Sequence, residues 1–140
     1  MGLYIDAIPE WVHASAAVVV VGAALWRGGR EERVGALVVA FQFINGYVPA
    51  LRWTVGAPTD LASLAVFLWL VLRRARYWTV WAAASAVLSL ATHALHAVLD
   101  MGLWAYLSAE VAWSYVLVGA VLIGSLQRRR PEAGAGAHVH

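Results

Sequence analysis

The chain has 140 residues, which is enough for one domain. Apolar residues make up 62% and charged residues 13%, against roughly a quarter charged in an ordinary soluble domain, so a soluble protein of this size would lack the polar surface to cover its core. The formal net charge is +2, all ten basic residues are Arg, and the absence of Cys excludes disulfides, thiolate metal sites and Cys nucleophiles.

Five apolar segments follow one another along the chain, and each predicts a helix. They span residues 8–26, 34–51, 59–72, 77–99 and 103–126. A helix needs about 20 residues to cross a membrane, and the second, fourth and fifth segments reach or approach that length. The third is short, and Pro58 suits its start better than its interior. We therefore expect an all-α, polytopic membrane bundle of about five transmembrane helices, or four if the third segment does not cross.

The Arg residues predict the orientation of this bundle. Three lie in the first connection (27–33), three in the third (73–76) and three in the tail (128–130), whereas the second connection holds only Arg52. With five spans, nine of the ten Arg fall on one side, which the positive-inside rule makes cytoplasmic. We expect a bacterial inner-membrane protein with a periplasmic N-terminus and a cytoplasmic C-terminus.

The segment ends complete the predicted domain organisation. Aromatic rings favour membrane interfaces, and six Trp residues fall at expected ends: Trp11, Trp53 and Trp104 on the periplasmic side, and Trp26, Trp78 and Trp81 on the cytoplasmic side. The first ten residues hold no basic residue, so we expect the first segment to be retained as a helix and not cleaved as a signal peptide. Residues 1–127 form the predicted transmembrane bundle, and residues 128–140 a disordered cytoplasmic tail.

Polar residues inside the predicted spans are costly there, so each is a candidate for function. The fourth segment has the most, at spacings of three and four that place them on one stripe: Ser85, Ser89, Thr92, His93, His96 and Asp100. Other segments carry His13, Gln42, Asn45, Asp60, Ser63, Ser108, Glu110 and Ser114. Given the predicted topology, most of the ionisable members lie in the periplasmic half.

Two interpretations of these residues stay open. Hydroxyls on a transmembrane stripe commonly mark helix–helix packing, and Arg52, Asp60 and Asp100 are then expected in loops. Alternatively, the imidazoles bind a cofactor, either a b-type haem or another metal. The candidate ligands are His13, His93 and His96, with His13 paired across helices to one of the other two. Asp100 and Glu110 would orient the ring N–H groups.

The sequence contains no nucleophile–base pair and no phosphate-binding loop, so we expect a non-enzymatic function. The leading hypothesis is an accessory or assembly subunit of a larger inner-membrane complex. The alternatives are a haem- or metal-binding electron-transfer subunit and a homo-oligomeric channel lined by the fourth helix. Expected partners are the lipid bilayer and other membrane subunits or further copies of the chain. Nucleic acid is not expected, because each Arg cluster holds only three Arg residues.

Loose motifs along most of the chain resemble small multi-pass inner-membrane proteins of alphaproteobacteria, sphingomonads especially. The motifs are Trp26-Arg27-Gly28-Gly29-Arg30-Glu31-Glu32-Arg33, Asp60, Arg76-Tyr77-Trp78 and Trp113-Ser114-Tyr115. This resemblance implies a membrane bundle and no particular activity. A second, local resemblance joins residues 93–102 to the haem-binding helix of the succinate dehydrogenase cytochrome b subunit. That subunit typically has three spans, and this chain lacks the Arg beside the ligand.

Overall fold

The chain folds into five helices and no strand over the residues that the computed structural model describes, 10–47, 56–99 and 102–127. The helices are α1 (Glu10–Arg27), α2 (Arg30–Tyr47), α4 (Gly56–Arg73), α5 (Tyr77–Leu99) and α6 (Leu103–Gln127). The predicted all-α class and the five elements are confirmed. The third predicted segment is longer than expected, because its helix has 18 residues and starts at Gly56.

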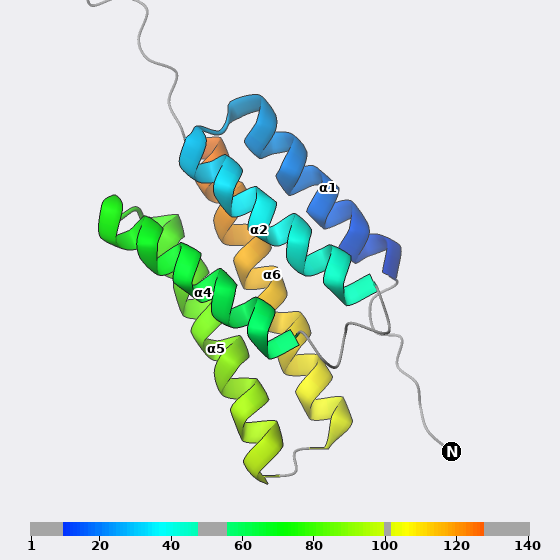
Figure 1. The fold of residues 1–140 in the computed structure, drawn as a ribbon. Coiled ribbons are helices and arrows are strands. Elements are labelled where there is room, and N and C mark those ends of the chain that lie inside the picture. The colour runs from blue at the N-terminus through cyan, green and yellow to red at the C-terminus, as the bar shows by residue number, and fades with distance from the viewer. Residues whose placement is uncertain (1–9, 48–55, 100–101, 128–140) are drawn as a thin grey trace, which may run out of the picture.

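Successive helices run antiparallel, so their ends gather at the two ends of the bundle (Figure 1). α6 packs against α5 and also against α1, and therefore joins the α4–α5 pair to the α1–α2 pair. α1 ends, α2 begins, α4 ends and α5 begins at the same end of the bundle. All six Arg residues of the described ranges lie at that end, as the sequence predicts: Arg27, Arg30, Arg33, Arg73, Arg74 and Arg76.

Ion pairs and a hydrogen bond of Glu31 and Glu32 connect the helices at this Arg-rich end. Glu32 is 1% exposed, and its Oε2 accepts a hydrogen bond of 2.8 Å from the backbone N–H of Gly29, which caps the start of α2. Its Oε1 lies 2.5 Å from Nη1 of Arg76, just before α5. Glu31 adds weaker ion pairs, 3.4 Å to Arg76 and 3.6 Å to Arg74. These contacts hold the start of α2 against the α4–α5 connection.

Trp78 fills the core near the same end and corrects one sequence prediction. We expected its ring at a membrane interface, but it is 3% exposed. Gly35 of α2 and Gly124 of α6 make room for it: a Cβ added at Gly124 would lie 2.5 Å from Cδ1 of the ring, and one at Gly35 would lie 3.1 Å from Cζ3. Side chains at both positions would occupy the space of the ring. Trp26, Trp81 and Trp104 are exposed, as expected.

Small and polar side chains occupy much of the interior, while large apolar ones face outward. Among the described residues, seven of the sixteen buried apolar ones are Ala, and nine further buried residues are polar or charged. By contrast, 24 large apolar side chains on the five helices are exposed. This distribution is the reverse of that in a soluble bundle, where the large apolar side chains face the core.

Two helices of the described ranges, α5 and α6, are long and apolar enough to cross a membrane. In their most apolar stretches, only 33% and 28% of the residues are buried within the chain. The first turn of α2 carries four charged residues, Arg30 to Arg33, and α4 contains Asp60 and ends at Arg73. Such charges lower the hydropathy of these 18-residue helices.

Candidate functional site

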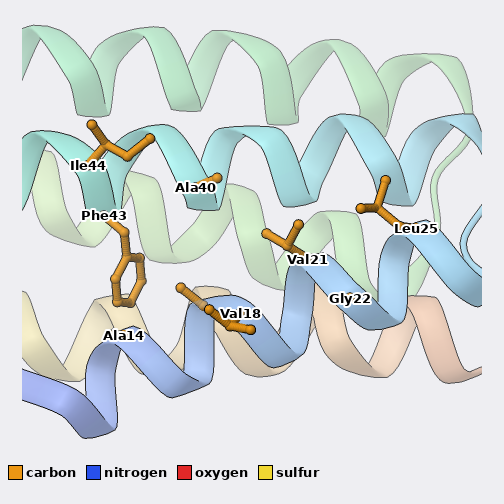
Figure 2. Close-up of a pocket in the computed structure, with 9 residues that line it drawn as sticks. Ala14, Val18, Val21, Gly22, Leu25, Ala40, Phe43 and Ile44 are labelled. Atoms are coloured by element: carbon orange, nitrogen blue, oxygen red, sulfur yellow. The ribbon is translucent and has the colours of Figure 1, made fainter.

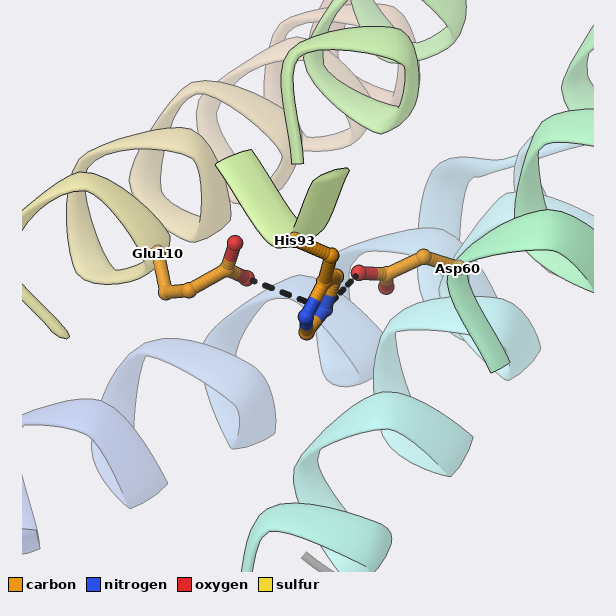
Figure 3. A group of neighbouring side chains, drawn as sticks. All are labelled: Asp60, His93 and Glu110. Carbon is orange, nitrogen blue, oxygen red and sulfur yellow. Dashed lines mark hydrogen bonds and ion pairs between the residues drawn. The ribbon is translucent and has the colours of Figure 1, made fainter. Parts of the chain in front are cut away.

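Asp60 of α4, His93 of α5 and Glu110 of α6 meet between their helices (Figure 3). One nitrogen or oxygen atom from each residue lies within 4.8 Å of the others. The interpretation that placed Asp60 in a loop is wrong, because α4 begins at Gly56 and Asp60 is helical and only 8% exposed. Pro58 falls in the first turn, where its missing N–H leaves no hydrogen bond unmade.

One hydroxyl lies between the two carboxylates. Ser89 Oγ is 2.6 Å from Oδ2 of Asp60 and 2.7 Å from Oε2 of Glu110. Since a Ser hydroxyl has a single hydrogen, it donates to one carboxylate at a time. His93 Nε2 is 3.1 Å from Asp60 Oδ2 and 4.0 Å from Glu110 Oε2, so it hydrogen-bonds the first carboxylate and only approaches the second.

Tyr106 of α6 holds the other side of the imidazole. Its hydroxyl is 2.9 Å from Nδ1 of His93. If the Tyr hydroxyl donates, the neutral ring carries its proton on Nε2 and donates to Asp60. If Nδ1 carries the proton and donates to the Tyr oxygen, the Nε2 lone pair faces the carboxylates and is free to bind a cation. The same side chains therefore support both tautomers.

Gln42 connects α2 to the group. Its Nε2 donates to Oδ1 of Asp60 and to Oγ of Ser63, both at 3.0 Å. The Ser63 hydroxyl in turn donates to the carbonyl of Thr59 at 2.8 Å. Both carboxylate oxygens of Asp60 thus accept hydrogen bonds, and side chains of two other helices, α2 and α5, fix its position.

The site has an excess of negative charge over the described residues. Glu31 and Glu32 pair with Arg side chains, whereas Asp60 and Glu110 form ion-pair contacts only with His93 in that part of the chain. Arg52 lies in 48–55, outside the described residues. Glu110 Oε1 is buried and has no hydrogen-bond partner among the described groups. A buried carboxylate (Asp60) and a half-buried one (Glu110) beside a single imidazole are costly unless protons or a cation neutralise them.

The other residues singled out from the sequence separate into two groups. Ser85, Ser89 and Thr92 are buried, which confirms that the stripe of α5 faces the interior. His96 is one turn from His93, but its ring stacks on Tyr106 with 4.5 Å between centroids and is not in the three-residue group. The side chain of His13, in α1, and all of Asp100 lie outside the described part of the structure.

Sequence reasoning missed Tyr106, although a signal for it was present. Tyr106, Glu110 and Trp113 follow at spacings of four and three, so they share one face of α6. That face meets the polar stripe of α5, where Trp113 Nε1 donates to Thr92 Oγ1 at 3.0 Å. The spacing gives the shared face of α6, but not which helix it faces.

Comparison with protein-family models, curated proteins and solved structures finds no match.

Proposed function

We propose that the chain is a five-span inner-membrane protein that binds a divalent transition-metal ion through Asp60, His93 and Glu110, as a non-enzymatic accessory subunit of a larger complex. The observation that carries the proposal is the meeting of two carboxylates with one imidazole, with no Arg partner over the described ranges. A divalent cation held by Oδ2 of Asp60, Nε2 of His93 and Oε2 of Glu110 would balance the two carboxylate charges.

The distribution of side chains supports the membrane location. Large apolar residues on the outside and Ala, Ser and Thr at the helix contacts are what a bilayer favours, because lipid solvates the former and small residues allow close helix packing. A soluble monomer rarely exposes contiguous apolar patches beyond a few hundred Å². The common end of the six described Arg residues supports a cytoplasmic face there, with the C-terminus on that side.

The donor set supports a transition metal over Ca²⁺ or Mg²⁺. Imidazole nitrogen with carboxylate oxygen suits Zn²⁺, Mn²⁺ or Fe²⁺, whereas Ca²⁺ and Mg²⁺ prefer oxygen ligands alone. A metal with bonds of about 2.0–2.2 Å needs its ligand atoms about 3–4 Å apart, close to the separations found here. Tyr106 and Gln42 would then orient His93 and Asp60 from behind, as outer partners do in metal sites.

The site fits a small ion better than a haem. Both ring nitrogens of His93 have partners at hydrogen-bond distance, Asp60 and Tyr106, so no ring nitrogen faces an open slot. His96 is on the same helix as His93 and its ring packs on Tyr106. A haem with two His ligands would need His13 from α1, and that side chain is outside the described residues.

The burial of the α5 stripe bears on the channel hypothesis. Ser85, Ser89 and Thr92 are buried within a single chain, so lining a pore between copies would require α5 to separate from α4 and α6. An accessory subunit needs no such rearrangement. Purification in mild detergent should then bring a second protein in fixed ratio with the chain.

Elemental analysis of the purified full chain tests the metal site. The protein is exposed to Zn²⁺, Mn²⁺ or Fe²⁺, and unbound metal is removed before measurement. We expect about one ion per chain in the wild type, and loss of most of it in Asp60→Asn and in His93→Ala. His96→Ala is the matched control, because it removes an imidazole one turn away and should leave the ion in place.

Three results would contradict the proposal. One is a helical wild-type protein, checked by circular dichroism, that retains none of these ions. Another is loss of the ion in His96→Ala but not in Asp60→Asn. The third is a dithionite-reduced absorption spectrum with a Soret band that disappears in His93→Ala, which would assign the site to haem.

A further inference from the structure

An open apolar groove runs between α1 and α2 (Figure 2), and none of its lining residues belongs to the site of Asp60. Its volume is about 610 Å³, within the range of small-molecule sites. The side chains that line it are entirely hydrocarbon: Ala14, Val18, Gly22 and Leu25 line it from α1, and Phe43 and Ile44 from α2. Nothing in its lining would satisfy a polar ligand.

The length of the groove matches one leaflet of a bilayer. On α1 it extends from Ala14 to Leu25, about 16 Å along the axis at ~1.5 Å per residue. Half of a hydrocarbon core of ~30 Å is about 15 Å. Leu25 is in the last turn of α1, which ends at the Arg-rich end of the bundle. In the proposed topology the groove then starts at the cytoplasmic surface and extends over about one leaflet.

Positive charge lies at the Leu25 end of the groove. The Arg33 guanidinium places Nη2 3.4 Å from the carbonyl oxygen of Leu25. Arg27 is two residues beyond Leu25, is exposed, and lies over the ring of Trp26 at 5.5 Å. The groove is thus apolar over about the length of an acyl chain, and two Arg residues lie at the end that would face the headgroups.

We propose that this groove binds an acyl chain of an anionic phospholipid, whose phosphate contacts Arg27 and Arg33. A phospholipid supplies both parts that the groove would recognise, a hydrocarbon chain and an anionic headgroup joined at the membrane surface. A neutral lipid lacks the net charge that these Arg residues attract. The helix of a second copy would bring its own Arg-rich end against this one if it packed in parallel, and like charges would repel.

Native mass spectrometry of the full chain in neutral detergent tests this inference. The probes are phosphatidylglycerol and phosphatidylcholine with identical acyl chains. We expect the wild type to retain phosphatidylglycerol at least tenfold more strongly, and Arg27→Gln with Arg33→Gln to remove this preference. Gly22→Leu should weaken both lipids, because the new side chain fills the groove.

A matched substitution separates filling of the groove from general damage. A Cβ added at Gly22 or at Gly119 of α6 meets no atom within 4 Å, so a side chain has room at both positions. Gly119 does not line the groove, and Gly119→Leu should bind lipid as the wild type does. Helical circular dichroism should be unchanged in both variants.

Two outcomes would overturn the inference. One is phosphatidylglycerol binding by Gly22→Leu that equals binding by Gly119→Leu. The other is that the wild type forms a dimer, that Gly22→Leu is monomeric, and that added phosphatidylglycerol does not dissociate the wild-type dimer. That result would assign the groove to a second copy of the chain.

Discussion

Gly124→Ala should destabilise the bundle through Trp78. The added Cβ would lie 2.5 Å from Cδ1 and 2.8 Å from Cδ2 of a ring that is 3% exposed and is also bounded by Gly35. A real Cβ never approaches so closely, so the ring or α6 must shift. Overpacking of this kind costs about 1–3 kcal/mol. The Ala side chain returns about 1 kcal/mol through helix propensity, so the net change alone would be hard to interpret.

Gly119→Ala removes that ambiguity. It makes the same substitution in the same helix, and its Cβ meets nothing within 4 Å. The propensity gain cancels between the two variants, and the free energies of unfolding should differ by about 1–3 kcal/mol, with Gly124→Ala the less stable. Unfolding in mixed micelles of rising dodecyl sulfate content, followed by circular dichroism, measures this difference.

Free energies of unfolding of the two variants that agree within about 0.5 kcal/mol, a typical limit of additivity, would refute a clash between the added Cβ and the ring. A second measurement identifies the ring as the cause. In a Trp78→Ala background the contact is gone, so the gap between the two glycine substitutions should close. A gap that persists there would place the strain elsewhere in α6.

Two further predictions concern the Arg-rich end. Glu32→Ala should lower the free energy of unfolding by about 2 kcal/mol, since it removes a helix cap at Gly29 and a charge-assisted hydrogen bond to Arg76. Glu31→Ala removes only the longer ion pairs and should lower the free energy of unfolding by less than about 1 kcal/mol. Equal losses in the same unfolding assay would contradict the assignment of the bonds. For topology, a reporter active only in the periplasm and fused after His140 should be inactive, and strong activity there would refute a cytoplasmic C-terminus.

The helices could be predicted from the sequence because local rules determine them. Apolar runs separated by Arg and Gly located all five, and α5 has the bounds that the pattern predicts. The start of α4 could not be located as well, because Pro58 is compatible with several positions in a first turn. The packing of Trp78 was also missed, since it depends on two glycines, Gly35 and Gly124, far from it in sequence.

The site was predictable one helix at a time. Spacing places Ser89 and His93 on one face of α5, and the sequence predicts Glu110 beside the imidazoles, where it lies in the structure. Which helices become neighbours is a tertiary property that spacing along one helix does not contain. The sequence pattern therefore favours a loop position for Asp60, whereas in the structure it contacts Ser89 and His93 directly. The spacing of three predicts a common role for His93 and His96. In the structure their surroundings differ, because the hydroxyl of Tyr106 contacts His93 whereas the ring of Tyr106 stacks on His96.

The outward position of the large apolar side chains has a thermodynamic consequence. In water, unfolding exposes apolar surface and raises the heat capacity, which makes the stability of a soluble bundle strongly curved with temperature. If the bundle spans a bilayer as proposed, the 24 exposed apolar side chains of its five helices would contact lipid before and after the helices separate. Separation of the helices then exposes little new apolar surface to water. The heat-capacity change should be small, so stability should vary nearly linearly with temperature and show no cold denaturation.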